Sequence, residues 1–104
     1  MYIITVLFTL QPEHSAAFLR AVTSNAQTSL NDEPGCRQFD VGVSTINPDD
    51  IFLYEVYDSK AAFDAHLASN HFIEFNAATA RWVKAKAVNA FERIHPVDHA
   101  NHAV

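Results

Sequence analysis

Glu55, His66 and His71 lie within LYEVYDSKAAFDAHLASNHFIEF, residues 53–75, a stretch whose apolar residues follow the pattern of a buried core. Glu55 interrupts an apolar strand pattern, and His66 falls on the apolar side of the helical pattern that follows. Both side chains would lose their water on folding, and a buried ionisable group needs a partner or a chemical role. A carboxylate that pairs with an imidazole orients the ring and tunes its basicity, as a general base for proton abstraction requires.

The elements around these residues predict that Glu55 and His66 meet. Alternation along a strand puts Glu55 on the face opposite to Tyr54 and Val56. His66 follows Phe63 by three residues, so both should lie on the inward face of one helix. Two interpretations stay open: His66 is a catalytic base oriented by Glu55, or it is a core histidine whose ring Glu55 satisfies.

His71 follows a helix break at Ser69-Asn70, so it stands at a predicted helix start, where it either shares the site or faces solvent. With Glu55 and His66 it would complete the ligand set of two histidines and one carboxylate that binds non-haem iron. Because the spacing matches no metal motif, we predict no metal and no other cofactor.

Aromatic residues form 12% of the chain and could line a pocket for a flat organic ligand. The candidates for substrate-binding walls are Phe39, Tyr57 and Trp82. Aromatic residues at regular spacing also build plain core, so this interpretation competes with a structural one.

Three cations cluster near the predicted end of the last helix, at Arg81, Lys84 and Lys86. They could attract an anionic ligand. Cations at a helix C-terminus are also favoured simply by the helix dipole, so both explanations remain.

Composition limits the class of protein. With 104 residues, 49% of them hydrophobic, the chain forms one domain. A net charge of −5 without a run of basic residues argues against nucleic acid as a partner. The opening MYIITVLFTL lacks a basic flank and is shorter than the roughly 20 apolar residues of a membrane helix, so we expect no membrane partner. A single cysteine allows no internal disulfide and fits the cytoplasm.

Periodicity predicts the order β-α-β-β-α-α-β, a ferredoxin-like α+β fold with an antiparallel sheet. The predicted strands are residues 2–10, 36–45, 51–57 and 87–94, and the predicted helices are residues 12–30, 58–68 and 71–83. We place the domain at residues 1–96 and a flexible tail, which carries His99 and His102, at residues 97–104.

The strands are apolar on both faces, although helices can cover only one face of such a sheet. Phe52, Tyr54 and Val56 alternate with Leu53 and Tyr57 in the third strand. A second copy of the chain would cover the open face by a symmetric contact, so we expect a homodimer.

Several segments together resemble the antibiotic biosynthesis monooxygenase (ABM) family over about residues 2–96. They are Glu33-Pro34-Gly35-Cys36, Phe39-Asp40-Val41, Tyr54-Glu55-Val56-Tyr57, Ala62-Phe63, His66 and His71-Phe72. The resemblance implies ferredoxin-like subunits that pair their sheets into a dimeric α/β barrel, with a hydrophobic pocket between the sheet and the helices of each subunit.

For function, the resemblance implies a cofactor-independent monooxygenase that acts on a small quinol-like or phenolic metabolite with molecular oxygen. His66 would be the base, Glu55 would orient it, and His71 would bind substrate or share the base role. Phe39 and Tyr57 would form walls. The family also resembles an isomerase of a phosphorylated autoinducer sugar, so a proton-shuttling isomerase of a small hydroxycarbonyl compound is an alternative. A non-catalytic ligand-binding dimer is the third.

Overall fold

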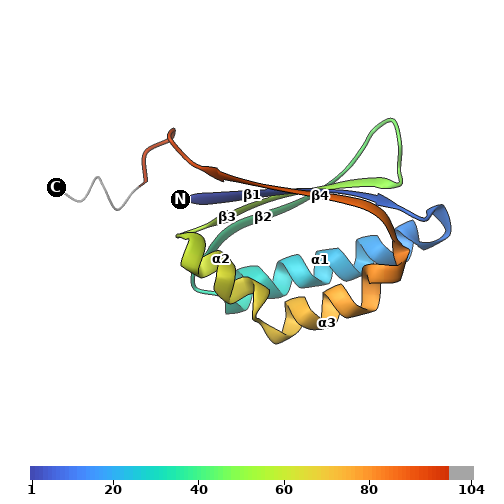
Figure 1. Cartoon of the computed structure of the whole chain (residues 1–104), viewed down its shortest axis with the longest axis horizontal. Coiled ribbons are helices and arrows are strands. Elements are labelled where there is room, and N and C mark those ends of the chain that lie inside the picture. Colours follow the sequence, from blue (N-terminus) through green and yellow to red (C-terminus); the bar gives the residue numbers. More distant parts are fainter. Residues whose placement is uncertain (99–104) are drawn as a thin grey trace.

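Four strands and three α-helices make up the computed structural model of this protein, which describes residues 1–98. The elements in chain order are β1 (Tyr2–Leu10), η1 (Pro12–His14), α1 (Ser15–Asp32), β2 (Cys36–Val43), β3 (Asp50–Tyr57), α2 (Lys60–Leu67), α3 (Asn70–Thr79), η2 (Ala80–Trp82) and β4 (Val83–Glu92). All three α-helices lie on one side of the sheet (Figure 1).

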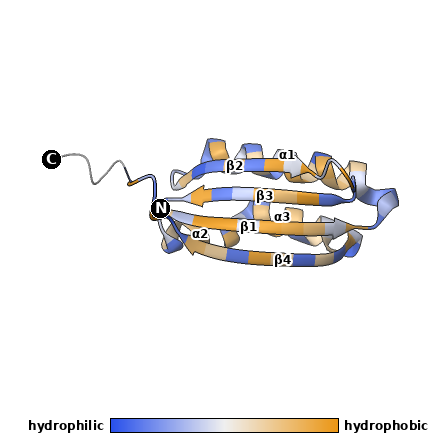
Figure 2. Cartoon of the chain, turned by 90° about the horizontal axis from the view of Figure 1, so that it is seen from above, coloured by the Kyte–Doolittle hydropathy of each residue, from blue (hydrophilic) through white to orange (hydrophobic). Residues whose placement is uncertain are grey.

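The sheet is antiparallel with the strand order β2-β3-β1-β4 (Figure 2). β1 lies in the middle, between β3 and β4. This order and the β-α-β-β-α-α-β sequence of elements confirm the predicted ferredoxin-like α+β fold.

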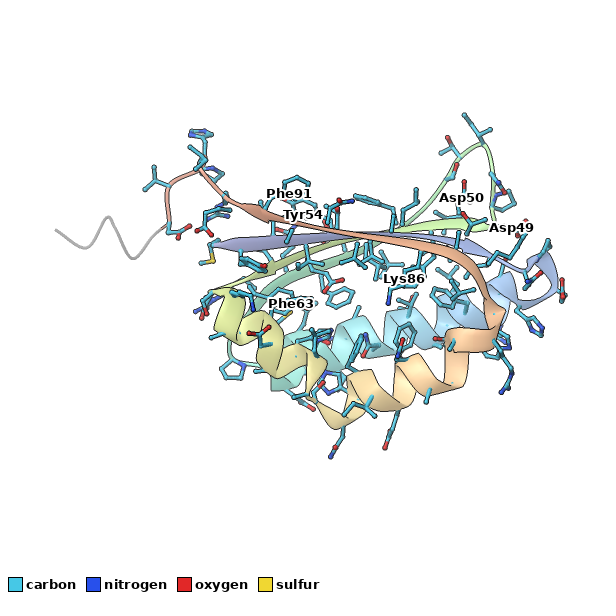
Figure 3. The ribbon with its side chains drawn as sticks, viewed as in Figure 1. Asp49, Asp50, Tyr54, Phe63, Lys86 and Phe91 are labelled. Atoms are coloured by element: carbon cyan, nitrogen blue, oxygen red, sulfur yellow. The ribbon has the colours of Figure 1, made fainter. Side chains whose placement is uncertain are left out.

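Alternation along the strands divides the sheet into a covered and an open face. On β1, Ile4, Val6, Phe8 and Leu10 are buried under the helices. Leu7 points the other way and is 45% exposed, next to its β3 partner Phe52 at 44%. Figure 3 shows the same division on the other strands, because Tyr54 and Phe91 point away from the helices while Lys86 points toward them. The helix side therefore holds the core, and the open face leaves Leu7, Phe52 and Phe91 exposed, although Val56 at one end of that face is buried.

The last strand begins earlier than the sequence pattern predicts. β4 starts at Val83 rather than at residue 87, and α3 ends at Thr79 rather than at residue 83. Lys and Ala form good helices, so residues 83–87 look helical in isolation. Pairing with β1 prevails here: Val83 lies opposite Leu10, and the amide of Gln11 donates to the carbonyl of Trp82 at 2.8 Å.

β4 forms an edge of the sheet, and all its residues after Val83 are exposed. Beyond it, the Asp98 carboxylate lies 2.6 Å from the Met1 ammonium and 3.0 Å from the Arg93 guanidinium. The remainder of the predicted tail, with His99 and His102, lies outside the described residues. None of the helices in residues 1–98 combines the length and apolar character needed to cross a membrane.

A tight turn at Glu33-Pro34-Gly35 carries the chain from α1 into β2 and brings it against α2. The Cys36 amide donates to the Glu33 carbonyl at 3.1 Å, and the Asp58 amide donates to the Gly35 carbonyl at 2.9 Å. A Cβ atom on Gly35 would lie 2.6 Å from the Cβ of Ala62 in α2. The lack of a side chain at Gly35 therefore sets how closely the turn approaches α2.

We expect Gly35→Ala to destabilise the protein by roughly 1–3 kcal/mol, because α2 must move away from the added methyl group. Gly42→Ala is the matched control, since its new Cβ would meet nothing closer than the Phe52 carbonyl oxygen at 3.8 Å. Chemical denaturation of both variants measures the difference. Adding Ala62→Gly to Gly35→Ala should recover part of the loss. Equal stability of the two single variants would contradict the close approach.

Candidate functional site

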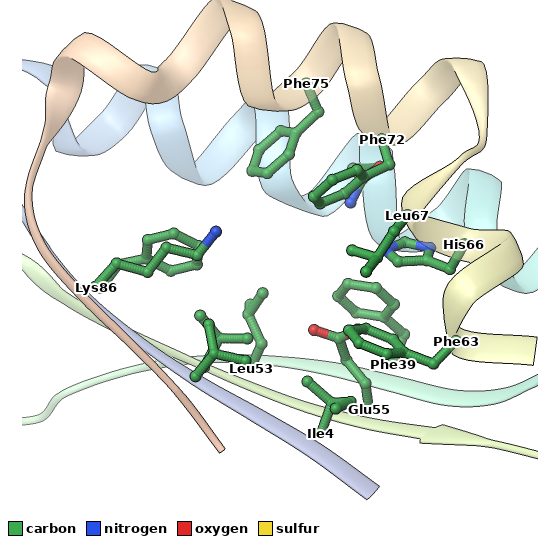
Figure 4. Close-up of a pocket in the computed structure, with 14 residues that line it drawn as sticks. Ile4, Phe39, Leu53, Glu55, Phe63, His66, Leu67, Phe72, Phe75 and Lys86 are labelled. Carbon is green, nitrogen blue, oxygen red and sulfur yellow. The ribbon is translucent and has the colours of Figure 1, made fainter. Parts of the chain in front are cut away.

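A cavity of about 260 Å³ lies between the sheet and the helices (Figure 4). Four of its lining residues are polar: Asn25, Glu55, His66 and Lys86. The others are aliphatic or aromatic, from β1, β2, β3, α2, α3 and β4. An apolar cavity with a few convergent polar groups is the usual form of a small-molecule site.

The carboxylate that binds His66 is Glu33, which corrects the predicted Glu55–His66 pair. Oε2 of Glu33 lies 2.8 Å from Nδ1 of His66 and 2.5 Å from Nε2 of His71. Among the described residues, no hydrogen bond joins Glu55 to His66. The cluster is largely shielded from water, because the side chains of Glu33 and His66 are 13% and 3% exposed.

Three helix ends meet to build this cluster. Glu33 is the C-cap residue of α1, His66 lies in the last turn of α2, and His71 lies in the first turn of α3. Ser69 fixes the junction between the last two helices: its hydroxyl accepts from the Phe72 amide and donates to the His66 carbonyl at 2.6 Å. The two histidines are therefore held at a fixed separation on either side of one carboxylate.

The role of Glu33 was not predicted from the sequence, in which this residue is only one of several that resemble the family motifs. A signal existed, because a negative charge at a helix C-terminus is unfavourable beside the helix dipole and requires a compensating partner. Here the compensation comes from two imidazole N–H groups. The partners are far away along the chain, so periodicity could not identify them.

The hydrogen bond to Glu33 sets the tautomer of His66. A carboxylate oxygen only accepts, so Nδ1 of the ring donates and Nε2 is left as the acceptor of a neutral imidazole. Burial lowers the pKa of His66, and its bond to Glu33 opposes that change. At neutral pH the ring is therefore uncharged, and its Nε2 can accept a proton.

Glu55 faces the helices as predicted and lines the same cavity. Its cross-strand neighbours are Ile4 and Phe39, and the Tyr57 hydroxyl donates to its Oε1 at 2.5 Å. Burial raises the pKa of Glu55 to about 7, although the hydrogen bond from Tyr57 works in the opposite direction. Burial and the neighbouring Glu55 also raise the pKa of Tyr57, so the phenol stays a donor.

The predicted wall residues divide into three cases. Phe39 lines the cavity, with its ring centroid 6.0 Å from that of His66. Tyr57 is fully buried and supports Glu55 without being a lining residue. Trp82 lies elsewhere, stacked on His14 with a centroid separation of 5.3 Å. Trp82 does not lie at the cavity, because the chain turns from η2 into β4 at this residue.

The metal-type ligand set that the sequence suggested exists with Glu33 in place of Glu55. One donor atom from each of Glu33, His66 and His71 lies within 4.8 Å of the others. Such a set can bind a divalent cation. Two N–H donors that share one carboxylate oxygen give the same spacing without an ion.

The profile of the family described as antibiotic biosynthesis monooxygenase matches residues 1–78. The chain belongs to this family. The match includes the turn at Glu33, the strand that carries Glu55 and both histidines of the cluster. The resemblance seen in the sequence is confirmed. Among curated proteins, none matches the chain.

Solved structures repeat the fold. A Nitrosomonas europaea protein provisionally named an antibiotic biosynthesis monooxygenase is 25% identical, with a TM-score of 0.87 over 91% of this chain and 100% of that one. Rv0793 from Mycobacterium tuberculosis is 21% identical, with a TM-score of 0.84 over 93% and 98% of the two chains. PA3566 from Pseudomonas aeruginosa is 20% identical, with a TM-score of 0.82 over 89% and 93%.

We expect Glu55 to make the protein less stable as the pH rises. Its folded-state pKa of about 7 exceeds the ordinary value of 4.5, so its contribution is fully present below about pH 4.5 and is lost as the pH rises through 7. Glu55→Gln removes this dependence and should gain up to about 3 kcal/mol on the wild type between pH 4.5 and 8.

Urea denaturation of both proteins at pH 5 and pH 8 checks this prediction. Glu13→Gln, at an exposed position in η1, is the control and should follow the wild type at both pH values. Parallel curves for the wild type and Glu55→Gln would show that Glu55 titrates as an ordinary surface carboxyl.

Proposed function

We propose that the protein works in the cytoplasm as a homodimeric, cofactor-independent monooxygenase that oxidises a small quinol-like or phenolic metabolite with molecular oxygen. The observation that carries this proposal is the arrangement of His66. Glu33 engages its Nδ1, and the ring lines an apolar cavity of a size that suits a small aromatic molecule. Membership of the monooxygenase family supports the same reaction class.

The residues supply proton transfer and exclusion of water. Nε2 of His66 removes the proton from a substrate hydroxyl, and Glu33 stabilises the imidazolium that forms. The substrate anion is electron-rich and transfers an electron to oxygen in a cavity with apolar walls. The substrate radical and superoxide then combine into a peroxide at a ring carbon that carries a hydrogen. The O–O bond breaks as this carbon loses its hydrogen, so one oxygen atom stays as the new carbonyl. The other leaves as water with the hydrogens of the ring carbon and the hydroxyl, and the phenol and O2 become a quinone and water.

Glu55 and His71 take supporting roles in this mechanism. Glu55 has a pKa of about 7 and lines the cavity, so it can hold or return a proton during turnover. His71 does not line the cavity, and its Nε2 donates to Glu33. We therefore assign His71 a positioning role, in place of the substrate contact expected from sequence.

A proton-shuttling isomerase is the second candidate. The observation in its favour is the presence of two proton acceptors, Glu55 and His66, in one cavity. Such a pair could move a proton next to the carbonyl of a hydroxycarbonyl compound. Lys86 is the single basic lining residue for a phosphate. A protein that only binds a ligand, the third candidate, would not use Glu55 and His66 for proton transfer.

The deciding experiment is oxygen uptake by the purified protein, with a chelator present, against a panel of naphthoquinols and phenols. We expect His66→Gln to lower kcat by roughly 10²–10⁴-fold, the usual contribution of a general base. Glu33→Gln should also lower kcat, because it weakens the control of the tautomer. His14→Gln alters a histidine outside the cavity and should retain activity.

Each outcome has a distinct meaning. Uptake that survives chelation and disappears with His66 supports the proposal. Uptake that requires an added divalent cation would instead assign the cluster of Glu33, His66 and His71 to a metal. Proton exchange on hydroxycarbonyl compounds without oxygen uptake would favour the isomerase.

The dimer part of the proposal rests on the open face of the sheet. Leu7, Phe52 and Phe91 are 45%, 44% and 51% exposed, and they come from three adjacent strands. Contiguous exposed apolar area of this kind usually marks an interface. Sheet-to-sheet packing of two copies would bury it by a symmetric contact.

We expect Leu7→Lys to convert the dimer into a monomer, because it places two charges in the centre of a symmetric apolar interface. Ile73→Lys is the control, since Ile73 is 53% exposed on α3 and lies on the helix side of the sheet. Light scattering coupled to size exclusion gives the mass of each variant. A wild-type monomer, or equal behaviour of the two variants, would refute this interface.

A further inference from the structure

We propose that the cavity recognises its substrate as an anion, and that Lys86 binds the negatively charged oxygen. The inference rests on the proposed function and narrows its substrate class. The ligand is a flat hydroxyaromatic molecule with a carboxylate or other anionic oxygen at one end and its reacting hydroxyl at the other.

Lys86 is placed on the cavity by the register of β4. It pairs with Phe8 of β1 on the covered face of the sheet, and its ammonium lies 5.4 Å from the centre of the Phe8 ring. Figure 3 shows the side chain pointing to the helix side, and Figure 4 shows it entering the cavity. Within residues 1–98 no ion pair involves Lys86, although its ammonium is close enough to Glu55 to lower the pKa of that carboxyl. A cation at an apolar cavity that has no direct ion-pair partner is available for an anionic ligand.

The other polar groups are arranged along the cavity away from Lys86. Figure 4 shows His66 on the side opposite to Lys86. Asn25 comes from α1, one turn before Ser29, whose hydroxyl lies 3.5 Å from Nδ1 of His66. A ligand that spans the cavity would therefore present one polar end to Lys86 and the other to His66.

Asn25 gives an independent sign that a polar ligand group belongs here. Its side chain lines the cavity and the residue is only 5% exposed, yet its Oδ1 has no hydrogen-bond partner. Leaving a buried acceptor unpaired is costly. A substrate hydroxyl could donate to Oδ1 of Asn25 and also lie within the part of the cavity that His66 serves.

The size of the cavity favours two fused rings. Its volume of about 260 Å³ falls just below the roughly 300–1,000 Å³ of pockets for drug-sized ligands. Charge balance also fits an anion: burial raises the pKa of Glu55, so its carboxyl can stay protonated beside a second negative group. With Glu55 protonated, His66 is the group that accepts the proton of the ligand hydroxyl.

A different explanation for Lys86 is protection of a sheet edge, since exposed lysines on edge strands discourage aggregation. The two explanations predict different behaviour. A lysine that only protects the edge affects solubility and leaves ligand binding unchanged, whereas a lysine that binds the ligand distinguishes an anion from a neutral molecule of the same shape.

The test measures equilibrium binding of 6-hydroxy-2-naphthoate and its neutral analogue 6-hydroxy-2-naphthamide by isothermal titration calorimetry. Both carry a hydroxyl at the far end of the rings. We expect the wild type to bind the carboxylate about tenfold more tightly than the amide, a preference limited by the partial exposure of Lys86. Lys86→Met should abolish the preference, and Lys86→Arg should keep it.

Lys84→Met is the matched control, because Lys84 lies on the same strand and does not line the cavity. Asn25→Leu should weaken binding of 6-hydroxy-2-naphthoate and leave that of 2-naphthoate, which lacks the hydroxyl, nearly unchanged. Equal affinities of carboxylate and amide for the wild type, or a preference that survives Lys86→Met, would overturn the proposal. Because no turnover is needed, this result is separate from oxygen uptake, which tests the proposed function.

Discussion

The site depends on the hydrogen bonds that the largely shielded carboxylate of Glu33 accepts from two histidines. The carboxylate sits at the negative end of α1 and accepts hydrogen bonds from His66 of α2 and His71 of α3. Removing either imidazole would leave a poorly solvated charge beside an unfavourable dipole. The same contact joins three helix ends and orients the ring that lines the cavity, so the packing of the helices and the chemistry of the site cannot be separated.

The apolar cavity acts on its two proton acceptors in opposite directions. Burial raises the pKa of the Glu55 carboxyl and lowers that of the His66 imidazole. Desolvation penalises the charged form in both cases, and the charged form is the base for one group and the acid for the other. Near pH 7 the imidazole is therefore mainly neutral and the carboxyl is close to its midpoint, so a small change in environment decides whether Glu55 carries a proton.

Much of the fold follows from local pattern, and the partners in the site do not. Alternation correctly placed Glu55 toward the helices, and helical spacing correctly turned His66 inward. The prediction that Glu55 binds His66 was wrong. The carboxylate that binds it is Glu33, which lies 33 positions away, and the turn after Glu33 can approach α2 only because Gly35 has no side chain. The start of β4 was predicted too late for a related reason. The helix propensity of residues 83–86 is overridden by pairing with β1, which is distant in sequence.

The edge strand β4 forms one wall of the cavity. It carries Lys86 and Val88, both lining residues. This wall is held mainly by its ladder with β1, whereas the cluster of Glu33, His66 and His71 is held by three helix ends. The group that would meet the charge of a ligand and the groups that would move its proton therefore belong to separate parts of the molecule.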